Sequence, residues 1–212
     1  MTCVFLVFNC ELTLAKICTV KISFFDQKNQ FKKYLEELKQ VPVMDYEKSQ
    51  LREKVSSIEI QNYSDLKELD LQPFFNYHIF PEHILSAYTQ WNDEQRSMQA
   101  GDTILQQVYL PPFPKFSQKA LFGVRIKEVI HEEKRCGFSY ETLKGHVECG
   151  ISHFILEERD GKIYFKIQTY SRPGNFLTRL LGPVFSLPYQ SFCTTKALKN
   201  VRKLIEPNLS NL

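Results

Sequence analysis

Four polar side chains in the second half of the chain have types and spacing that can support chemistry. His146 and Glu148 lie two positions apart, so on an extended segment they project to the same side, and an imidazole oriented by a carboxylate is the core of a general base. Tyr140 can donate a hydrogen bond, and Arg172 can hold a carboxylate or a phosphate. These four residues are the candidate ligand-binding set, and His146 with Glu148 is the candidate catalytic pair.

Each candidate also has a structural interpretation. The phrase G-H-x-E-x-G can be a shaped loop in which His146 and Glu148 satisfy backbone groups and each other. Tyr140 can simply pack, and Arg172 can form an ion pair with Glu148 or Glu141 that ties two strands together. At the level of sequence both interpretations stay open for every member of the set.

The remaining residues give little support for a metal, a cofactor or another nucleophile. The other histidines, at positions 78, 83, 131 and 153, have no ligand-like spacing, and the six cysteines form no CxxC pair. Cys136 and Cys149 flank the candidate set without a neighbouring base in the sequence, so a reactive thiol is not indicated. The chain shows neither a P-loop nor a dinucleotide fingerprint. We therefore expect no metal and no cofactor.

The composition is that of a globular protein with mixed surface charge. Of its 212 residues 43% are hydrophobic and 13% aromatic, and 27 Lys and Arg against 24 Asp and Glu give a net charge of +3, too small to indicate a nucleic-acid partner. The apolar start contains only a short uninterrupted run, because Glu11, Lys16 and Lys21 interrupt any membrane span. We expect a strand-like start, no integral membrane segment and a cytoplasmic location; a weak signal anchor at the N-terminus stays open.

Strands are expected to position the candidate set. Side chains alternate over residues 151–156 and 163–168 as in half-buried strands, and Asp160-Gly161 between them supplies the two positive-φ residues of a type I′ turn. A two-residue hairpin between strands of about eight residues is therefore predicted. Further strands are expected at residues 77–80, 84–91, 103–110 and 120–132, of which 84–91 can also be a short helix, with a proline-rich exposed loop at 111–114.

Helical periodicity appears towards both ends of the chain. Residues 26–39 predict an amphipathic helix that is capped near Asp26 and ended by Pro42, and residues 46–58 predict a second, more polar helix. Near the C-terminus, helices are expected over residues 175–181 and 184–205; in the last half of the second, Leu198, Val201 and Ile205 share one face.

Several strands in succession, closed by one long helix, predict an α+β fold in which a curved antiparallel sheet holds the C-terminal helix. We expect residues 1–75 to form an N-terminal extension of a strand-like start and amphipathic helices, and residues 76–212 to form the main domain. A strongly curved sheet over a helix leaves a concave, largely apolar space, and such spaces bind small hydrophobic ligands.

Residues 138–150, which read FSYETLKGHVECG, together with Ser171-Arg172-Pro173 and the run LLGPV at 180–184, resemble the family called domain of unknown function 1990 (DUF1990). That family typically shows F-x-Y-x-T-L-x-G-H-x-E-x-G followed by F-S-R-P, and Tyr170 stands here where Phe is usual. The resemblance is specific over residues 136–184 and extends over about 77–205. It implies a START-like, helix-grip fold around a hydrophobic cavity, in agreement with the pattern of elements.

The resulting hypothesis is a non-enzymatic module that binds a lipid or other hydrophobic small molecule between sheet and helix, with Tyr140, His146, Glu148 and Arg172 as polar contacts. A second hypothesis is an enzyme acting on a hydrophobic substrate, with His146 and Glu148 as the base and Tyr140 or Arg172 holding a developing oxyanion. A third is a protein-interaction module in which the first 75 residues pack on the sheet or on a second subunit.

Overall fold

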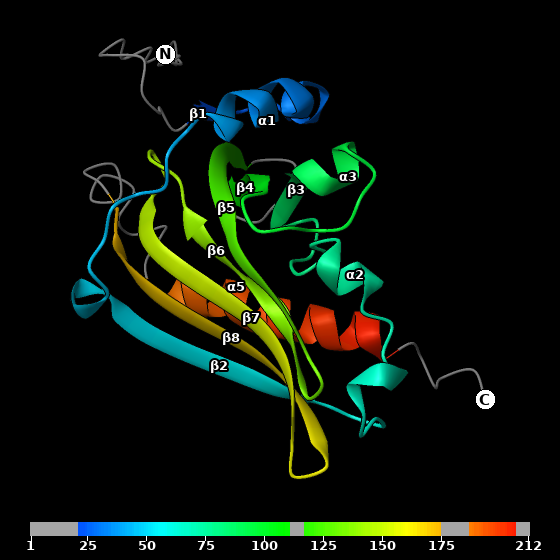
Figure 1. The fold of residues 1–212 in the computed structure, drawn as a ribbon. Coiled ribbons are helices and arrows are strands. Elements are labelled where there is room, and N and C mark those ends of the chain that lie inside the picture. Colours follow the sequence, from blue (N-terminus) through cyan, green and yellow to red (C-terminus); the bar gives the residue numbers. More distant parts are fainter. Residues whose placement is uncertain (1–20, 111–116, 175–186, 207–212) are drawn as a thin grey trace, which may run out of the picture.

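A single curved antiparallel sheet forms the body of the molecule. The computed structural model describes residues 21–110, 117–174 and 187–206. The strands follow the order β2-β8-β7-β6-β5-β4-β3, and β1 pairs with the part of β5 that β6 does not reach. Figure 1 shows the long strands curving together. The strands are β1 (Lys21–Ser23), β2 (Arg52–Ile60), β3 (Leu85–Thr89), β4 (Thr103–Leu110), β5 (Gln118–Glu132), β6 (Arg135–Thr142), β7 (Glu148–Arg159) and β8 (Lys162–Pro173).

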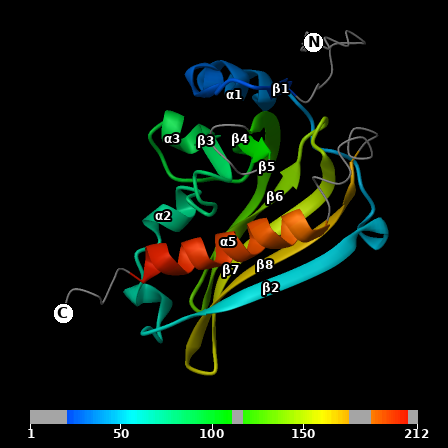
Figure 2. The same cartoon turned by 180° about the vertical axis from the view of Figure 1, so that it is seen from behind.

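The helices lie on both faces of this sheet. The longest, α5 (Leu187–Ile205), crosses the concave face in front of β7 and β8 in Figure 2, while α1 (Phe31–Lys39) lies near β3 and β4 at the other end. Shorter helices are α2 (Gln72–Phe75) and α3 (Gln90–Asp93), and single 3-10 turns are η1 (Lys28–Gln30), η2 (Lys48–Gln50) and η3 (Leu66–Glu68).

Helix α5 packs against the sheet through one apolar stripe of side chains. Ala197, Leu198, Val201 and Ile205 are all buried in the main hydrophobic core. They belong to the same core as Phe165 and the other inward side chains of β7 and β8. The α+β, helix-grip fold class predicted from the sequence is thereby confirmed, and the apolar face expected for residues 198–205 is the face that is buried.

The hairpin between β7 and β8 confirms the turn predicted at Asp160-Gly161. Both residues have positive φ, 53° and 71°, and Arg159 pairs with Lys162 across them. Each strand has 12 residues, longer than the eight expected, because the backbone ladder continues past the apolar alternation. The strands expected at 103–110 and 120–132 are β4 and β5, and the ambiguous stretch 84–91 divides between strand β3 and the start of helix α3.

The polar helix predicted for residues 46–58 is wrong. These residues contain η2 and then β2, which pairs with β8 over its whole length, from Arg52 opposite Ser171 to Ile60 opposite Ile163. Of the inward positions, Lys54, Ser56 and Ile58 are half-buried and Ile60 is buried, as expected of an edge strand curving over a core. The sheet therefore extends into the part of the chain that we assigned to an N-terminal extension; the division into domains at residue 75 stays a prediction.

The first predicted helix is present but shorter than expected. Asp26 Oδ1 accepts a hydrogen bond from the Lys28 N–H at 2.9 Å, η1 follows, and α1 itself begins at Phe31. Strand β6 was not predicted. Buried residues occur on both of its faces, so its sequence gives no alternation of polarity. The strand-like start, the loop at 111–114 and the helix at 175–181 lie outside the described residues.

Helix α1 is attached to the convex face through its apolar side and its C-terminus. Phe31 and Leu35 pack on Leu105 and Leu121 of β4 and β5. Below them Arg125 Nη2 donates to the carbonyls of residues 38, 39 and 41, at 3.0 to 3.1 Å. The Leu38 carbonyl also accepts from the N–H of Val41 at 3.0 Å, so the half-buried guanidinium of Arg125 adds to the hydrogen bonds that cap the C-terminal end of α1.

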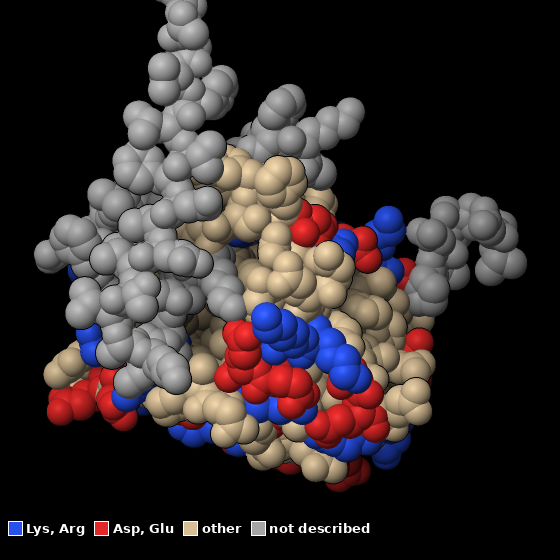
Figure 3. All heavy atoms as spheres, turned by 90° about the horizontal axis from the view of Figure 1, so that it is seen from above, with Lys and Arg blue, Asp and Glu red and all other residues tan. Residues whose placement is uncertain are grey.

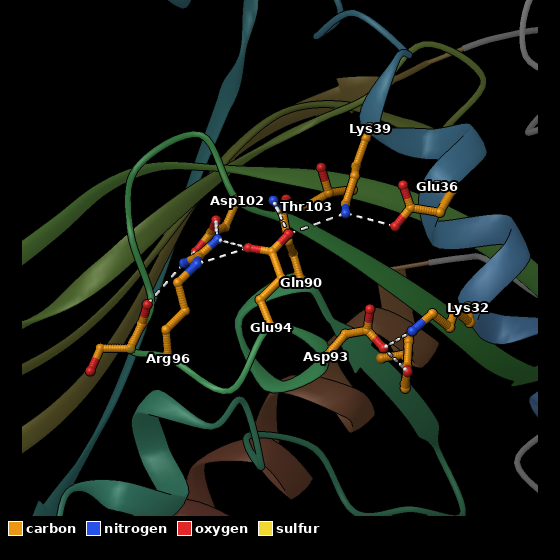
Figure 4. Close-up of polar contacts among 11 residues, drawn as sticks. Lys32, Glu36, Lys39, Gln90, Asp93, Glu94, Arg96, Asp102 and Thr103 are labelled. Atoms are coloured by element: carbon orange, nitrogen blue, oxygen red, sulfur yellow. Dashed lines mark hydrogen bonds and ion pairs between the residues drawn. The ribbon is translucent and has the colours of Figure 1, made fainter.

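Ion pairs connect α1 to the segment that follows β3. Figure 4 shows Lys39 Nζ between the carboxylates of Glu36 at 2.7 Å and Glu94 at 3.2 Å. Arg96 binds Asp102 through two nitrogens, at 2.8 and 2.5 Å, and Asp102 is almost fully buried. The carboxylates of this network all have basic partners, so its role is to hold the α3 segment against β4 and α1.

Candidate functional site

The concave face of the sheet changes from apolar to polar along β8. Ile163 and Phe165 are fully buried and Ile167 is 6% exposed, whereas the next two inward positions, Thr169 and Ser171, are only half-buried. Among the described residues, the cover over the concave face is thus closed above the apolar part and only partial above Thr169 and Ser171. A small molecule that entered here would meet hydroxyl groups first and the hydrophobic core beyond them.

A row of hydroxyl groups crosses the polar part of this face. Tyr140 of β6 pairs with Ser152 of β7, and Ser152 pairs with Thr169 of β8, so successive strands bring the three side chains side by side. The hydroxyl oxygens of Ser152 and Thr169 are 3.0 Å apart. We call Tyr140, Ser152 and Thr169 the hydroxyl row.

Tyr140 lies where the hydroxyl row meets the aromatic core. Its ring is 5.3 Å from that of Phe154 and 6.3 Å from that of Tyr77, centroid to centroid. Gln106 Nε2 donates to the Tyr77 hydroxyl at 2.6 Å, which satisfies the polar end of that buried ring. Burial raises the pKa of Tyr140 above its usual value, so its hydroxyl keeps its proton and can donate a hydrogen bond at neutral pH.

Aromatic rings fill the interior next to the hydroxyl row. Phe138 and Phe154 stack on neighbouring strands with centroids 5.2 Å apart, and Phe74 of α2 packs edge-on against Phe165 at 5.7 Å. All four are at most 1% exposed. Such rings form a rigid apolar floor, which suits contact with the apolar part of a ligand.

His146 is placed in the turn between β6 and β7 and is held by backbone. Its Nδ1 lies 3.0 Å from both the N–H and the C=O of Glu148, and its ring packs against Phe122 at 4.9 Å. Burial lowers the pKa of His146 to about 4, so the imidazole is neutral at physiological pH. The sequence spacing did bring His146 and Glu148 together, but the contact is made by the backbone of Glu148 and supplies no carboxylate orienting an imidazole.

The other two predicted residues lie on opposite faces of the sheet. Glu148 precedes Ser152 by four residues in β7, so both side chains lie on the concave face. The negative charge of Glu148 adds to the effect of burial in raising the pKa of Tyr140. Arg172 pairs with Cys149, whose position next to Glu148 in β7 points to the other face, so Arg172 lies on the convex face. Burial raises the pKa of the Cys149 thiol, and the positive charge of Arg172 lowers it by a smaller amount. The sheet thus separates Arg172 from Tyr140.

Four residues of this face were missed from sequence: Ser152 and Thr169 in the hydroxyl row, and Tyr77 with Gln106 behind it. The alternation of residues 151–156 already placed Ser152 on the same side as Phe154. Which of the two sides turned towards the core was undecided, because Ile151, His153 and Ile155 offered an equally apolar alternative. The alternation in the sequence therefore indicated a strand but did not show which of its faces lines the core.

The described residues contain no group of three or more His, Cys, Asp or Glu side chains placed to hold a metal ion. None of the helices in the described ranges is both long and apolar enough to span a bilayer. On the face seen in Figure 3, acidic and basic side chains lie next to one another in a common band and do not form separate patches of one sign.

Comparison with known families gives a match over residues 74–200 to the model described as "Domain of unknown function (DUF1990)". The chain belongs to this family. The match covers β3 to β8 and most of α5, so the DUF1990 region includes the hydroxyl row and the aromatic floor. Strand β2 completes the sheet from outside the matched residues.

More distant similarities extend to other organisms. A UPF0548 protein of Deinococcus radiodurans is 32% identical over 71 residues, and the alignment spans 33% of this chain and 36% of the relative. Among solved structures, ginseng major latex-like protein 151 from Panax ginseng is 9% identical with a TM-score of 0.48, covering 74% of this chain and 99% of that one. A hypothetical protein of Helicobacter pylori is 8% identical with a TM-score of 0.46, covering 77% and 95%.

Proposed function

We propose that this DUF1990 protein binds a lipid or another hydrophobic small molecule that carries a polar group, between the polar part of the concave face and α5. The observation that carries the proposal is the half-burial of Tyr140 and Thr169, the two outer members of the hydroxyl row, next to a fully buried aromatic floor. A ligand that is apolar at one end and polar at the other matches this change of lining. Tyr140 is its hydrogen-bond donor, Ser152 and Thr169 are further polar contacts, and Glu148 lies at the rim.

The apolar part of the ligand supplies most of the binding free energy. Each buried methylene contributes about 0.8 kcal/mol, whereas one neutral hydrogen bond contributes about 1 kcal/mol in total. The hydroxyl row therefore sets the orientation of the ligand and the choice among polar groups. His146 and Arg172, which were also candidates, have structural roles in this proposal, because one is held by backbone and the other lies on the convex face.

Binding without turnover is the form of the proposal that the site supports best. An imidazole with a pKa of about 4 is a weak base at neutral pH, and its Nδ1 is already engaged by the backbone of Glu148. A cytoplasmic location agrees with the free, buried thiols of Cys136 and Cys149, since reduced cysteines are usual in that compartment.

The first test is native mass spectrometry of freshly purified protein, followed by organic extraction and identification of the released molecule. We expect a hydrophobic compound that leaves on extraction. Binding of a fluorescent fatty acid then compares Thr169→Val with Tyr170→Phe, a control one residue away on the convex face. Loss of one hydrogen bond predicts about fivefold weaker binding for Thr169→Val and no change for Tyr170→Phe. A bare mass together with equal affinities in both variants would exclude this ligand site.

A further inference from the structure

A second hollow lies on the convex side of the sheet, away from the proposed lipid site. It has a volume of about 530 Å³ and is lined by two buried and four exposed side chains. The buried ones, Tyr109 and Lys119, are opposite each other on β4 and β5 and form the floor. The exposed ones form a rim of polar side chains: Asp26, Lys28, Glu82 and His83.

The floor contains a buried ammonium group without a counter-charge in the described part of the chain. Lys119 is 7% exposed, and its Nζ donates to the carbonyls of Phe24 and Ser117, both at 2.8 Å. Both acceptors are neutral, and no described carboxylate lies within ion-pair distance of Lys119. An ammonium has three N–H donors, so one remains beyond these two contacts. A buried cation is costly unless an anion compensates it, and an anionic group in the hollow would do so.

The rim of the hollow contains two carboxylates, those of Asp26 and Glu82. Asp26 Oδ1 accepts from the N–H of Lys28 at 2.9 Å and from Gln107 Nε2 at 3.3 Å, so its carboxylate is held in place by neutral donors. Glu82 adds a second exposed carboxylate to the lining. Among the described residues that line the hollow, the positive charges of Lys28 and Lys119 balance the negative charges of Asp26 and Glu82. A simple anion would bind the floor but meet two carboxylates at the rim.

We infer that this hollow binds a small zwitterion of the α-amino-acid class, with its carboxylate at Lys119 and its ammonium at Glu82 and Asp26. Such a molecule supplies a counter-charge that Lys119 lacks among the described residues, and it pairs with the carboxylates of the rim at the same time. The hollow, at about 530 Å³, is large enough to admit such a molecule. The site is on the face of α1, so it is independent of the ligand proposed for the concave face.

The experiment titrates the isotope-labelled full chain with glycine, glutamate, lysine, phenylalanine, acetate and ethylamine, each in turn, and follows amide chemical shifts. We expect at least one amino acid to give saturable shifts at residues 82, 109 and 119. Acetate carries only the carboxylate and ethylamine only the ammonium group. Each should therefore bind at least about tenfold more weakly than the amino acid. Acetate binding as tightly as every amino acid, or no saturable shift with any probe up to about 10 mM, would overturn the inference.

Two variants identify the contacts, with an exposed acidic residue elsewhere as the control. Lys119→Met should abolish saturable binding. Glu82→Gln, on an exposed loop, should weaken it by about fivefold, as expected for a solvent-accessible ion pair. Glu133→Gln, in the turn between β5 and β6, should leave it unchanged. If Lys119→Met does not fold, Glu82→Gln still decides, because unchanged affinity there contradicts the assigned ammonium contact. Thr169→Val tests only the concave face and should have no effect here.

Discussion

The neutral imidazole of His146 makes the stability of the folded chain depend on pH. In the unfolded chain a histidine has its ordinary pKa of 6.5, whereas in the folded chain burial lowers the pKa of His146 to about 4. Between these values the unfolded state binds a proton that the folded state does not. Acid therefore favours unfolding, and the stability present at pH 7 is lost progressively as the pH falls from about 6.5 to about 4.

We predict that the free energy of unfolding falls by about 1 to 2 kcal/mol between pH 7 and pH 5 through His146 alone. The measurement is chemical denaturation at both pH values for wild type and His146→Asn, whose amide still offers a donor and an acceptor to Glu148. The pH dependence should be smaller in His146→Asn. His78→Gln, an exposed histidine, serves as the control; an equal reduction there would contradict the assignment to His146.

At the scale of elements, the contact between β7 and β8 depends on a glycine. Gly150 has φ +156°, and a Cβ at that position would lie 1.9 Å from the carbonyl oxygen of Tyr170 and 2.9 Å from the Cα of Ser171. Both are backbone atoms of β8, so they cannot move away without separating the strands. Gly161 in the hairpin turn also has positive φ, +71°, but a Cβ there would meet nothing within 4 Å.

These two glycines allow a matched prediction. Gly150→Ala should lower the free energy of unfolding by about 3 kcal/mol or more, because it adds a backbone clash to an unfavourable conformation. Gly161→Ala should cost about 1 kcal/mol, since only the conformational strain applies. Urea denaturation monitored by circular dichroism measures both. Equal costs for the two substitutions would show that the strands can separate at Gly150 without penalty.

At the scale of the whole molecule, the closed fold depends on the contact of α5 with the sheet. The helix buries one stripe of side chains, among which Val201 is 1% exposed, while Lys199 on the same helix is exposed. This contact joins the C-terminal helix to a strand from much earlier in the chain, because α5 lies against β2 as well as β8. Releasing the helix should therefore expose the aromatic floor of the proposed ligand site.

We predict that Val201→Asp lowers stability by more than about 3 kcal/mol, because it places an unpaired charge in the core. Lys199→Asp introduces the same aspartate on the exposed face of the helix, and it should lower the free energy of unfolding by less than about 1 kcal/mol. Hydrogen exchange of the α5 amides measures whether the helix detaches, and fatty-acid binding measures whether the site survives. Retention of slow exchange in Val201→Asp would contradict the importance of this contact.

Several features of this protein were determined by the sequence alone, and all of them are local. The positive-φ pair Asp160-Gly161 specifies its turn whatever surrounds it, and the alternation of residues 103–110 specifies a strand. The stripe formed by Leu198, Val201 and Ile205 recurs at helical spacing and was correctly expected to be buried. In each case the pattern that indicates the structure involves residues only a few positions apart.

What only the tertiary structure decided depends on pairing between distant segments. Strand β2 has enough polar residues to suit a helix, and it becomes a strand because the free edge of β8, about a hundred residues later, supplies its hydrogen bonds. The register of β7 and β8 decides that Glu148 lies on the concave face and Arg172 on the convex one. The tertiary structure also brings the carbonyl of Phe24, 95 residues away in the sequence, to the ammonium group of Lys119. A one-dimensional pattern cannot state which edge a strand joins or which face turns inward, because both depend on the core that the whole chain forms.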